Sequence, residues 1–170
     1  MALHPTATRL WKHLPQEDRL AAAAAFFAET PPELTGPAIG ALAKARHLRP
    51  QAARALAPDA QARILATVLD PGEPLAQGLL VALHLGERRP LLRAFLDALA
   101  LPHEDGVLKE EGDAAAAPVS PEQARAGVAA LASFPAARVR TYLNTLWLQD
   151  PDRWGALESA AEEIGGPAEA

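Results

Sequence analysis

Apolar residues recur along this chain at the three- and four-residue spacing of amphipathic α-helices, in a series of short segments. Most of these segments begin at or near a proline, which is tolerated in the first turn of a helix but breaks a helix interior. No segment shows the alternating period and the β-branched residues that are typical of a strand. The pattern therefore predicts an all-α fold. Nine of the 16 prolines stand at or near the front of such a segment: Pro15, Pro32, Pro50, Pro58, Pro74, Pro90, Pro121, Pro135 and Pro151.

The expected helices are short and follow one another closely. Because short turns join them, neighbouring helices are expected to lie antiparallel. We predict a compact bundle of about seven to eight short antiparallel helices, forming a single domain over residues 1–164. Because a helix recurs about every 16 residues, a short HEAT-like stack of α-hairpins is the alternative fold. The expected helices cover residues 15–28, 32–47, 50–56, 59–69, 75–86, 90–99, 121–132 and 135–147, and a last segment begins at residue 151.

The helix expected over residues 90–99 is the most hydrophobic, and we place it and the preceding helix, over residues 75–86, at the centre of the core. The helix over residues 32–47 carries Gly36 and Gly40, which would let another backbone approach closely. The apolar residues of the helix expected over residues 90–99 share one face: Leu91, Leu92, Phe95, Leu96 and Leu99.

The helical pattern lapses over residues 102–119, which we predict to form a mobile acidic loop. Inside it, Asp105 and Gly106 indicate a turn in which the glycine takes a positive φ. After the loop, Ser120 and Gln123 predict a capping box that begins the next helix. Residues 165–170 are expected to be a disordered tail.

Charge is unevenly distributed along the 170 residues, whose net charge is −5. Residues 1–57 hold seven basic and four acidic side chains, whereas residues 101–170 hold five basic and twelve acidic ones. Such an asymmetry can steer a partner or align copies of the chain head to tail. The chain has no cysteine, which excludes a disulfide framework and thiol catalysis.

Nothing in the sequence indicates secretion or a membrane. The first residues lack the basic flank and the apolar core of a signal peptide. The charge-free stretch 74–86 is 13 residues long, whereas a membrane-spanning helix needs about 20. We therefore expect a cytoplasmic protein.

The first candidate binding site lies at two turns that flank the most hydrophobic helix. Imidazole, guanidinium and carboxylate groups there could meet a small molecule or a metal, provided that at least three of them converge on one pocket. The alternative interpretation involves no ligand. The histidine at the first turn lies at a helix C-terminus, where the helix dipole favours a cation, and the second turn ends a helix. The residues of this candidate site are His84, Arg88, Arg89, His103, Glu104 and Asp105.

The second candidate is a partner surface in the basic first third of the chain. Six side chains there could meet anionic groups: Lys44, Arg46, His47, Arg49, Arg54 and Arg63. The pI of about 5.5 argues against nucleic acid as the partner. Trp11, in a short segment before the first expected helix, is either a core residue or an exposed anchor for a partner. The residues that we predict to form the partner surface are Trp11, Lys44, Arg46, Arg49 and Arg54.

No catalytic motif accompanies these residues. No Gly-x-Ser-x-Gly occurs, and the paired carboxylates lie in expected solvated positions, where their protonation is not tuned for acid–base catalysis. We expect a non-catalytic helical interaction module, a scaffold, adaptor or regulatory subunit, with no cofactor or metal. Its partner is expected to be a protein or a second copy of the chain, rather than a nucleic acid or a membrane. The alternative is a helical small-molecule or metal-binding protein with its site near His84, Arg88 and His103.

Overall fold

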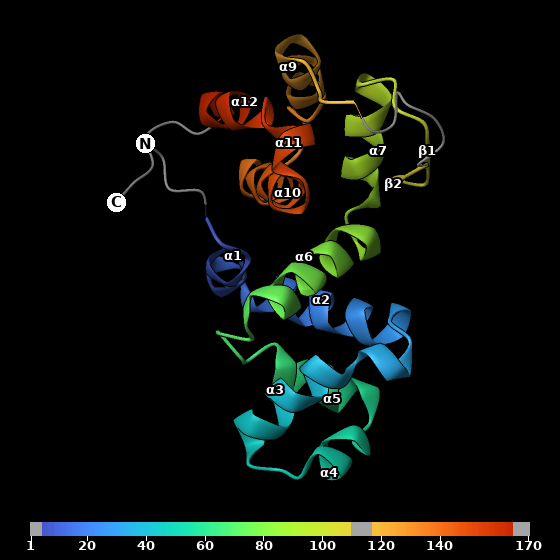
Figure 1. Ribbon diagram of the computed structural model, residues 1–170, viewed down its shortest axis with the longest axis vertical. Coiled ribbons are helices and arrows are strands. Elements are labelled where there is room, and N and C mark those ends of the chain that lie inside the picture. Colours follow the sequence, from blue (N-terminus) through green and yellow to red (C-terminus); the bar gives the residue numbers. More distant parts are fainter. Residues whose placement is uncertain (1–4, 110–116, 165–170) are drawn as a thin grey trace. The chain divides into compact units, whose positions relative to one another are not determined.

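The chain folds into short α-helices, as the proline pattern predicts. The structure is a computed structural model that describes residues 5–109 and 117–164, and the described residues hold eleven α-helices and one two-stranded hairpin (Figure 1). The prediction of an all-α multi-helix bundle is confirmed. Eight of the described helices have eight residues or more, and the other three span two turns or less. Residue contacts divide the chain into two compact units, residues 1–87 and 88–170, and the single domain predicted over residues 1–164 stays a prediction.

The first unit contains six α-helices and one 3₁₀ turn within its described residues. Proline or glycine stands at the start of most of them, because these residues end the preceding segment and tolerate the first turn of the next. The elements are α1 (Ala7–His13), α2 (Gln16–Glu29), η1 (Pro32–Leu34), α3 (Gly36–Arg46), α4 (Pro50–Arg54), α5 (Pro58–Leu65) and α6 (Glu73–Gly86).

The centre of the first unit is the pair α2 and α6. Alanines make their contact close: Ala22, Ala23 and Ala76 are fully buried, and a Cβ atom added to Gly86 would lie 3.1 Å from that of Ala25. α1 packs on α6, α5 packs on α2, and α3 packs on both α4 and α5. Contacts between helices far apart in sequence, such as α1 with α6, are typical of a bundle, since the units of a solenoid contact only their neighbours.

One side chain at the start of α6 stabilises the start of α1. The carboxylate of Glu73 accepts hydrogen bonds from the backbone N–H groups of Ala7, at 2.6 Å, and Thr8, at 3.1 Å. These N–H groups have no partner within their own helix. Burial by itself would raise the pKa of Glu73, but the hydrogen bonds from Thr8 and Ala7 outweigh it and hold the pKa below its ordinary value of 4.5.

Replacement of Glu73 by glutamine is expected to lower the free energy of unfolding by about 1 kcal/mol at neutral pH, the usual value of a helix N-cap. Because the pKa of Glu73 is lowered in the folded state, its charge stabilises the fold above pH 4.5, and this stabilisation disappears as pH falls through the folded-state pKa. Urea unfolding between pH 7 and pH 3 checks this. The difference between wild type and variant should shrink with acid, whereas Glu33→Gln, at an exposed position, should change little; a difference independent of pH contradicts the assignment.

The described residues of the second unit form α7 (Arg89–Ala98), the strands β1 (His103–Glu104) and β2 (Val107–Leu108), and four later helices. These are α9 (Pro121–Ala130), α10 (Ala136–Gln149), α11 (Pro151–Trp154) and α12 (Leu157–Ile164). α9 packs on α7 and α12, and α10 packs on α11 and α12.

The core of the second unit is built around Phe95 of α7. Its ring meets Tyr142 edge to face, with centroids 5.4 Å apart, and lies 6.0 Å from the ring of Trp154. The five apolar residues predicted for the central helix are all buried, as expected. Gly127 of α9 faces this cluster, and a Cβ atom there would lie 2.4 Å from Leu99 Cδ1 and 2.6 Å from Phe95 Cε2. The absence of a side chain at residue 127 therefore lets α9 approach α7.

Local signals in the sequence correctly located two helix starts in this unit. The Ser120 hydroxyl accepts from the Gln123 N–H while the Gln123 side chain accepts from the Ser120 N–H, which is the predicted capping box. The last segment, expected to begin at residue 151, does begin there as α11, which Asp150 caps by accepting from the N–H of Arg153. The helix expected from residue 59 begins one residue earlier, at Pro58, so Asp59 lies in the first turn of α5.

Three further expectations need correction. The segment before Pro15 is a helix, α1, which Thr6 caps by accepting from the Arg9 N–H. The expectation that the chain has no strand is wrong, because β1 and β2 pair antiparallel. Part of the predicted loop has regular structure, since residues 103–108 belong to the hairpin and Val119 is buried, and the mobility of the loop stays a prediction; residues 110–116 and the predicted tail, 165–170, lie outside the described residues.

Within the part of the chain that the structure describes, no helix combines the length and the apolar character needed to cross a membrane.

Candidate functional site

The turn that carries three of the candidate residues is a tight β-hairpin. Asp105 and Gly106 link β1 to β2, with φ values of 49° and 87°. Positive φ at both central residues defines a type I′ turn, for which Asp-Gly is a favoured sequence. Glycine is required here for a second reason, since a Cβ atom on Gly106 would lie 2.9 Å from the Cβ atom of Leu92. The hairpin therefore lies directly against α7.

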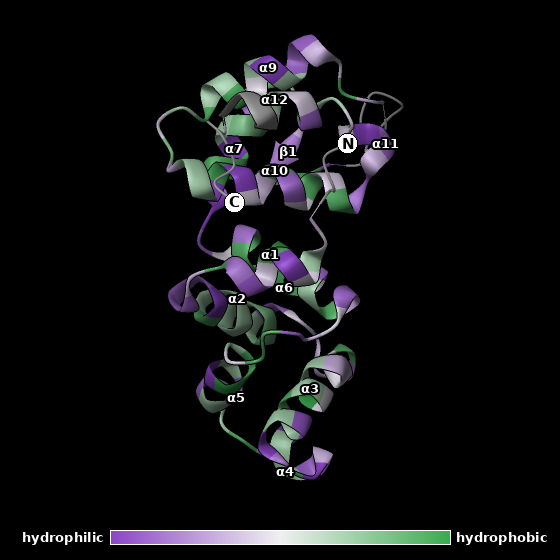
Figure 2. Ribbon diagram, turned by 90° about the vertical axis from the view of Figure 1, so that its left-hand side faces the viewer, coloured by the Kyte–Doolittle hydropathy of each residue, from purple (hydrophilic) through white to green (hydrophobic). Residues whose placement is uncertain are grey.

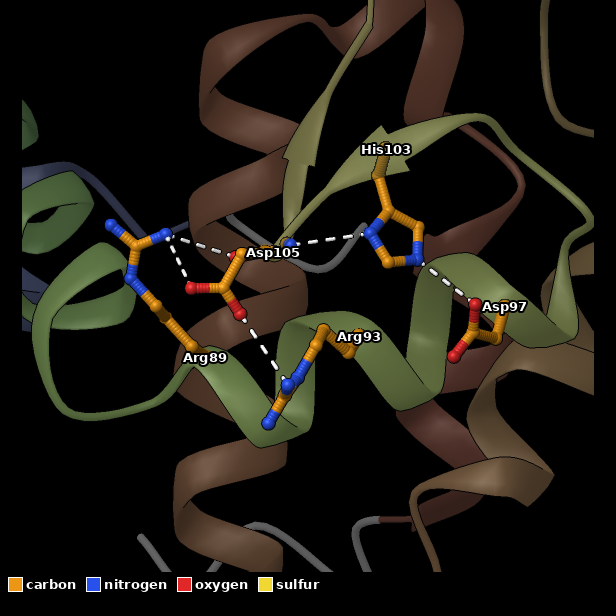
Figure 3. Close-up of polar contacts among 6 residues, drawn as sticks. Arg89, Arg93, Asp97, His103 and Asp105 are labelled. Carbon is orange, nitrogen blue, oxygen red and sulfur yellow. Dashed lines mark hydrogen bonds and ion pairs between the residues drawn. The ribbon is translucent and has the colours of Figure 1, made fainter.

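A polar stripe on α7 receives this hairpin. Arg89, Arg93 and Asp97 are spaced four residues apart and so share one face of the helix. The Asp105 carboxylate lies between the two arginines, 3.2 Å from Arg89 Nη1 and 3.5 Å from Arg93 Nη1 (Figure 3). Arg89 Nη1 also donates to the Asp105 carbonyl at 3.0 Å. One carboxylate therefore neutralises part of the positive charge of two guanidinium groups and holds the turn on the helix.

His103 makes a hydrogen bond with each of its ring nitrogens. Nδ1 accepts from the Gly106 N–H at 3.2 Å, and Nε2 lies 2.9 Å from Asp97 Oδ1 (Figure 3). Since a nitrogen that accepts carries no proton, the proton of the neutral ring belongs on Nε2, which donates to Asp97. Both nitrogens are then engaged within the protein, and a metal would have to displace one of these bonds.

NMR spectroscopy is expected to find the neutral ring of His103 as the Nε2–H tautomer. Because Nδ1 of this tautomer accepts from the Gly106 N–H, the Gly106 amide should be protected from hydrogen exchange, and His103→Phe should remove that protection. Glu104→Gln, which alters an exposed neighbour, should leave this behaviour unchanged. An Nδ1–H tautomer, or a Gly106 amide that exchanges equally fast in wild type and in His103→Phe, contradicts the assignment.

The charged side chains of the hairpin and of the polar stripe on α7 mainly form ion pairs and hydrogen bonds with one another. These side chains are Arg89, Arg93, Asp97, His103 and Asp105. Glu104 is exposed and lies 3.6 Å from Lys109 Nζ. In the described ranges no group of three or more histidine or acidic side chains is placed to hold a metal ion. The arrangement can stabilise the hairpin, at the modest strength of partly exposed ion pairs.

The structure brings together only part of the first candidate set. Arg89 and Asp105 are paired, whereas His103 and Glu104 each pair with a residue outside the set. His84 lies in the last turn of α6 in the first unit, and Arg88 precedes α7 in the second; both are buried. Arg93 and Asp97 were not among the residues predicted from the sequence. Their four-residue spacing with Arg89, next to the Asp-Gly dipeptide, is the signal that could have found them.

The basic residues of the second candidate site lie on an exposed surface of the first unit. Lys44 and Arg46 lie in the last turn of α3, Arg49 precedes α4, and Arg54 ends α4. All four side chains are exposed, and none has an ion pair or a hydrogen bond from its side chain among the described residues. We call these four residues the basic surface; the hydrophilic segments of α3 and α4 are purple in Figure 2.

The sequence around the basic surface contains no compensating charge. No acidic residue occurs between Glu33 and Asp59. Cations favour the C-terminal turn of a helix, which accounts for Lys44, Arg46 and Arg54. Arg49 stands at the N-terminal end of α4, where a cation is unfavourable, so helix stability does not explain it.

Arg63 and Trp11 do not contribute to this surface. Arg63 is exposed, but its Nε donates to the Asp59 carbonyl one turn earlier in α5. Trp11 has no exposed area, and its Nε1 donates to the Val68 carbonyl at 2.7 Å. The core interpretation of Trp11 is therefore correct, and its inclusion among partner-surface residues is wrong.

Comparison of the chain with protein-family models, with curated proteins and with solved structures found no match.

Proposed function

We propose that this protein is a non-catalytic cytoplasmic interaction module, a scaffold, adaptor or regulatory subunit, that binds an acidic segment of a partner protein through the basic surface. The observation that carries the proposal is four exposed cations on α3 and α4 without a single acidic residue in the same stretch of chain. Unpaired cations on adjacent helices repel one another, and an anionic partner relieves that repulsion.

A rigid support positions the cations. Ile39, Leu42 and Ala43 of α3 pack with Ala53 of α4 in one buried cluster. The amide of Gln61, in α5, donates to the Ala53 and Arg54 carbonyls at 3.1 Å each and so satisfies the end of α4. Because the backbone that bears the arginines is fixed in this way, little ordering is required when a partner binds.

Most cations of the basic surface are arginines, which favours a protein segment that carries carboxylates as the partner. The planar guanidinium binds a carboxylate through two parallel hydrogen bonds, and it is more weakly hydrated than an ammonium group. Leu48, 37% exposed, lies between Arg46 and Arg49 and supplies an apolar contact. An acidic segment with an apolar residue fits this combination, whereas a nucleic acid would call for a basic protein overall.

The test is capture of partners from a lysate of the source cell with the full chain in three forms. The first is wild type, the second carries Arg46→Glu and Arg49→Glu, and the third carries Arg138→Glu and Arg140→Glu as a matched control on exposed arginines of α10. We expect a stoichiometric protein to be retained by the wild type and the control, and to be depleted at least about tenfold by the first double variant. Binding of the purified partner should weaken as salt concentration rises.

Other outcomes contradict the proposal. Equal capture by all three forms removes the basic surface from the interaction. Capture that is lost after nuclease treatment identifies a nucleic acid as the partner. A metal or metabolite bound to the purified chain, found by mass spectrometry without any protein partner, favours the alternative of a small-molecule or metal site near His84, Arg88 and His103.

A further inference from the structure

A groove of about 490 Å³ lies beside the turn that joins α9 to α10 in the second unit. α9 ends at Ala130, and α10 begins after Pro135. Leu131 and Val139 are buried beneath the groove, and Val128 and Phe134 are half-buried beside it. The alanines at positions 129, 132 and 136 are exposed, and their small side chains leave the space open.

One charged residue, Arg125, joins seven apolar residues in the lining of the groove. It is exposed and precedes Val128 and Ala129 by three and four residues, so it lies on the same face of α9. Its guanidinium has neither an ion pair nor a hydrogen bond within the described residues. An unpaired cation therefore adjoins an otherwise apolar groove.

The size of the groove distinguishes between classes of ligand. Sites for small molecules usually measure about 300–1,000 Å³ and combine an apolar lining with few polar groups. A stable protein interface needs about 20–30 residues on each side. The eight residues that line this groove are too few for such an interface.

We propose that this groove binds a small apolar carboxylate, with the carboxylate on Arg125 and the hydrocarbon against Val128, Phe134 and Val139. Guanidinium and carboxylate match in charge and in planar geometry. Removal of the hydrocarbon from water supplies the remaining affinity. This site is separate from the basic surface and does not depend on the proposed function.

The experiment is a titration of the ¹⁵N-labelled full chain with octanoate, followed by amide shifts. The controls are 1-octanol, which has the hydrocarbon without the charge, and octylamine, which carries the opposite charge. We expect saturable shifts at groove residues such as Ala129 and Ala132. Octylamine should bind more weakly than octanoate, because Arg125 repels it.

Two pairs of variants test the residues themselves. Arg125→Gln should weaken octanoate at least about tenfold and leave 1-octanol unchanged, whereas Arg138→Gln, exposed on α10 and outside the lining, should have no effect. Ala129→Leu should fill the groove and abolish the shifts, whereas Ala130→Leu, exposed on the same helix but outside the lining, should not. All four positions are exposed, so the variants are expected to fold.

Three results would overturn the proposal. The first is the absence of saturable shifts in the groove below about 10 mM octanoate. The second is an octanoate affinity that Arg125→Gln and Arg138→Gln change equally. The third is retention of binding by Ala129→Leu, which would place the ligand elsewhere.

Discussion

Replacing Trp11 with alanine is expected to lower the free energy of unfolding by about 3–5 kcal/mol, the range for removal of a buried aromatic side chain. Trp11 has no exposed area, so its loss leaves a cavity in the first unit. Its indole N–H also satisfies the Val68 carbonyl in the segment after α5. The variant therefore loses packing and a hydrogen bond in one step.

Urea unfolding followed by far-ultraviolet circular dichroism measures this effect. Trp11→Phe keeps most of the apolar volume but lacks the N–H, so it should cost less than the alanine variant. Lys12→Ala, at the exposed neighbouring position, should change stability by no more than about 0.5 kcal/mol. If Trp11→Ala behaves like Lys12→Ala, then Trp11 is not a core residue in solution.

The second large effect is expected at Gly127. A Cβ atom at this position would meet Leu99 and Phe95 at distances under 3.0 Å, so Gly127→Ala must displace α9 or the ring of Phe95. Overpacking of this kind costs about 1–3 kcal/mol, and we expect the upper end because two separate side chains obstruct the new methyl group. The signals of the Phe95 and Tyr142 rings in NMR spectra should shift, because the two rings are in contact.

Gly40→Ala is the matched control for Gly127→Ala. Gly40 lies inside α3 with nothing within 4 Å of an added Cβ atom, so alanine there should stabilise the protein by about 0.5–1 kcal/mol. The same substitution is thus expected to have opposite signs at two helical glycines. Thermal unfolding of both variants measures the two changes in stability. Destabilisation by Gly40→Ala would mean that another part of the protein covers α3.

The candidate sites show which information a sequence carries locally. The Asp-Gly turn was correctly expected to need a positive φ at Gly106, because only the local backbone conformation is involved. The hairpin around it was missed, since strands of two residues are too short to show an alternating pattern. The partners of Asp105 and His103 were missed for a different reason: they depend on the placement of the hairpin on α7, which no local pattern encodes.

The interpretation of the predicted partner surface depended on whether Trp11 is buried. Sequence showed that Lys44, Arg46, Arg49 and Arg54 lie in a stretch without acidic residues. It could not distinguish an exposed Trp11 beside them from a buried one, because tryptophan serves in cores and in interfaces alike. The indole is buried because α1 packs on α6, a contact between the two ends of the first unit.

By itself, the sequence determined the helical class, most of the helix starts, the capping box at Ser120 and the buried face of α7, since each follows from backbone chemistry or from periodicity within one segment. The tertiary structure alone decided where backbones approach one another. Gly36 and Gly40 were expected to permit a close approach, yet nothing lies within 4 Å of either, whereas Gly127 and Gly106 permit the contacts with α7. The physical reason is that a glycine's conformational effect is local, but its effect on packing depends on which distant helix covers it.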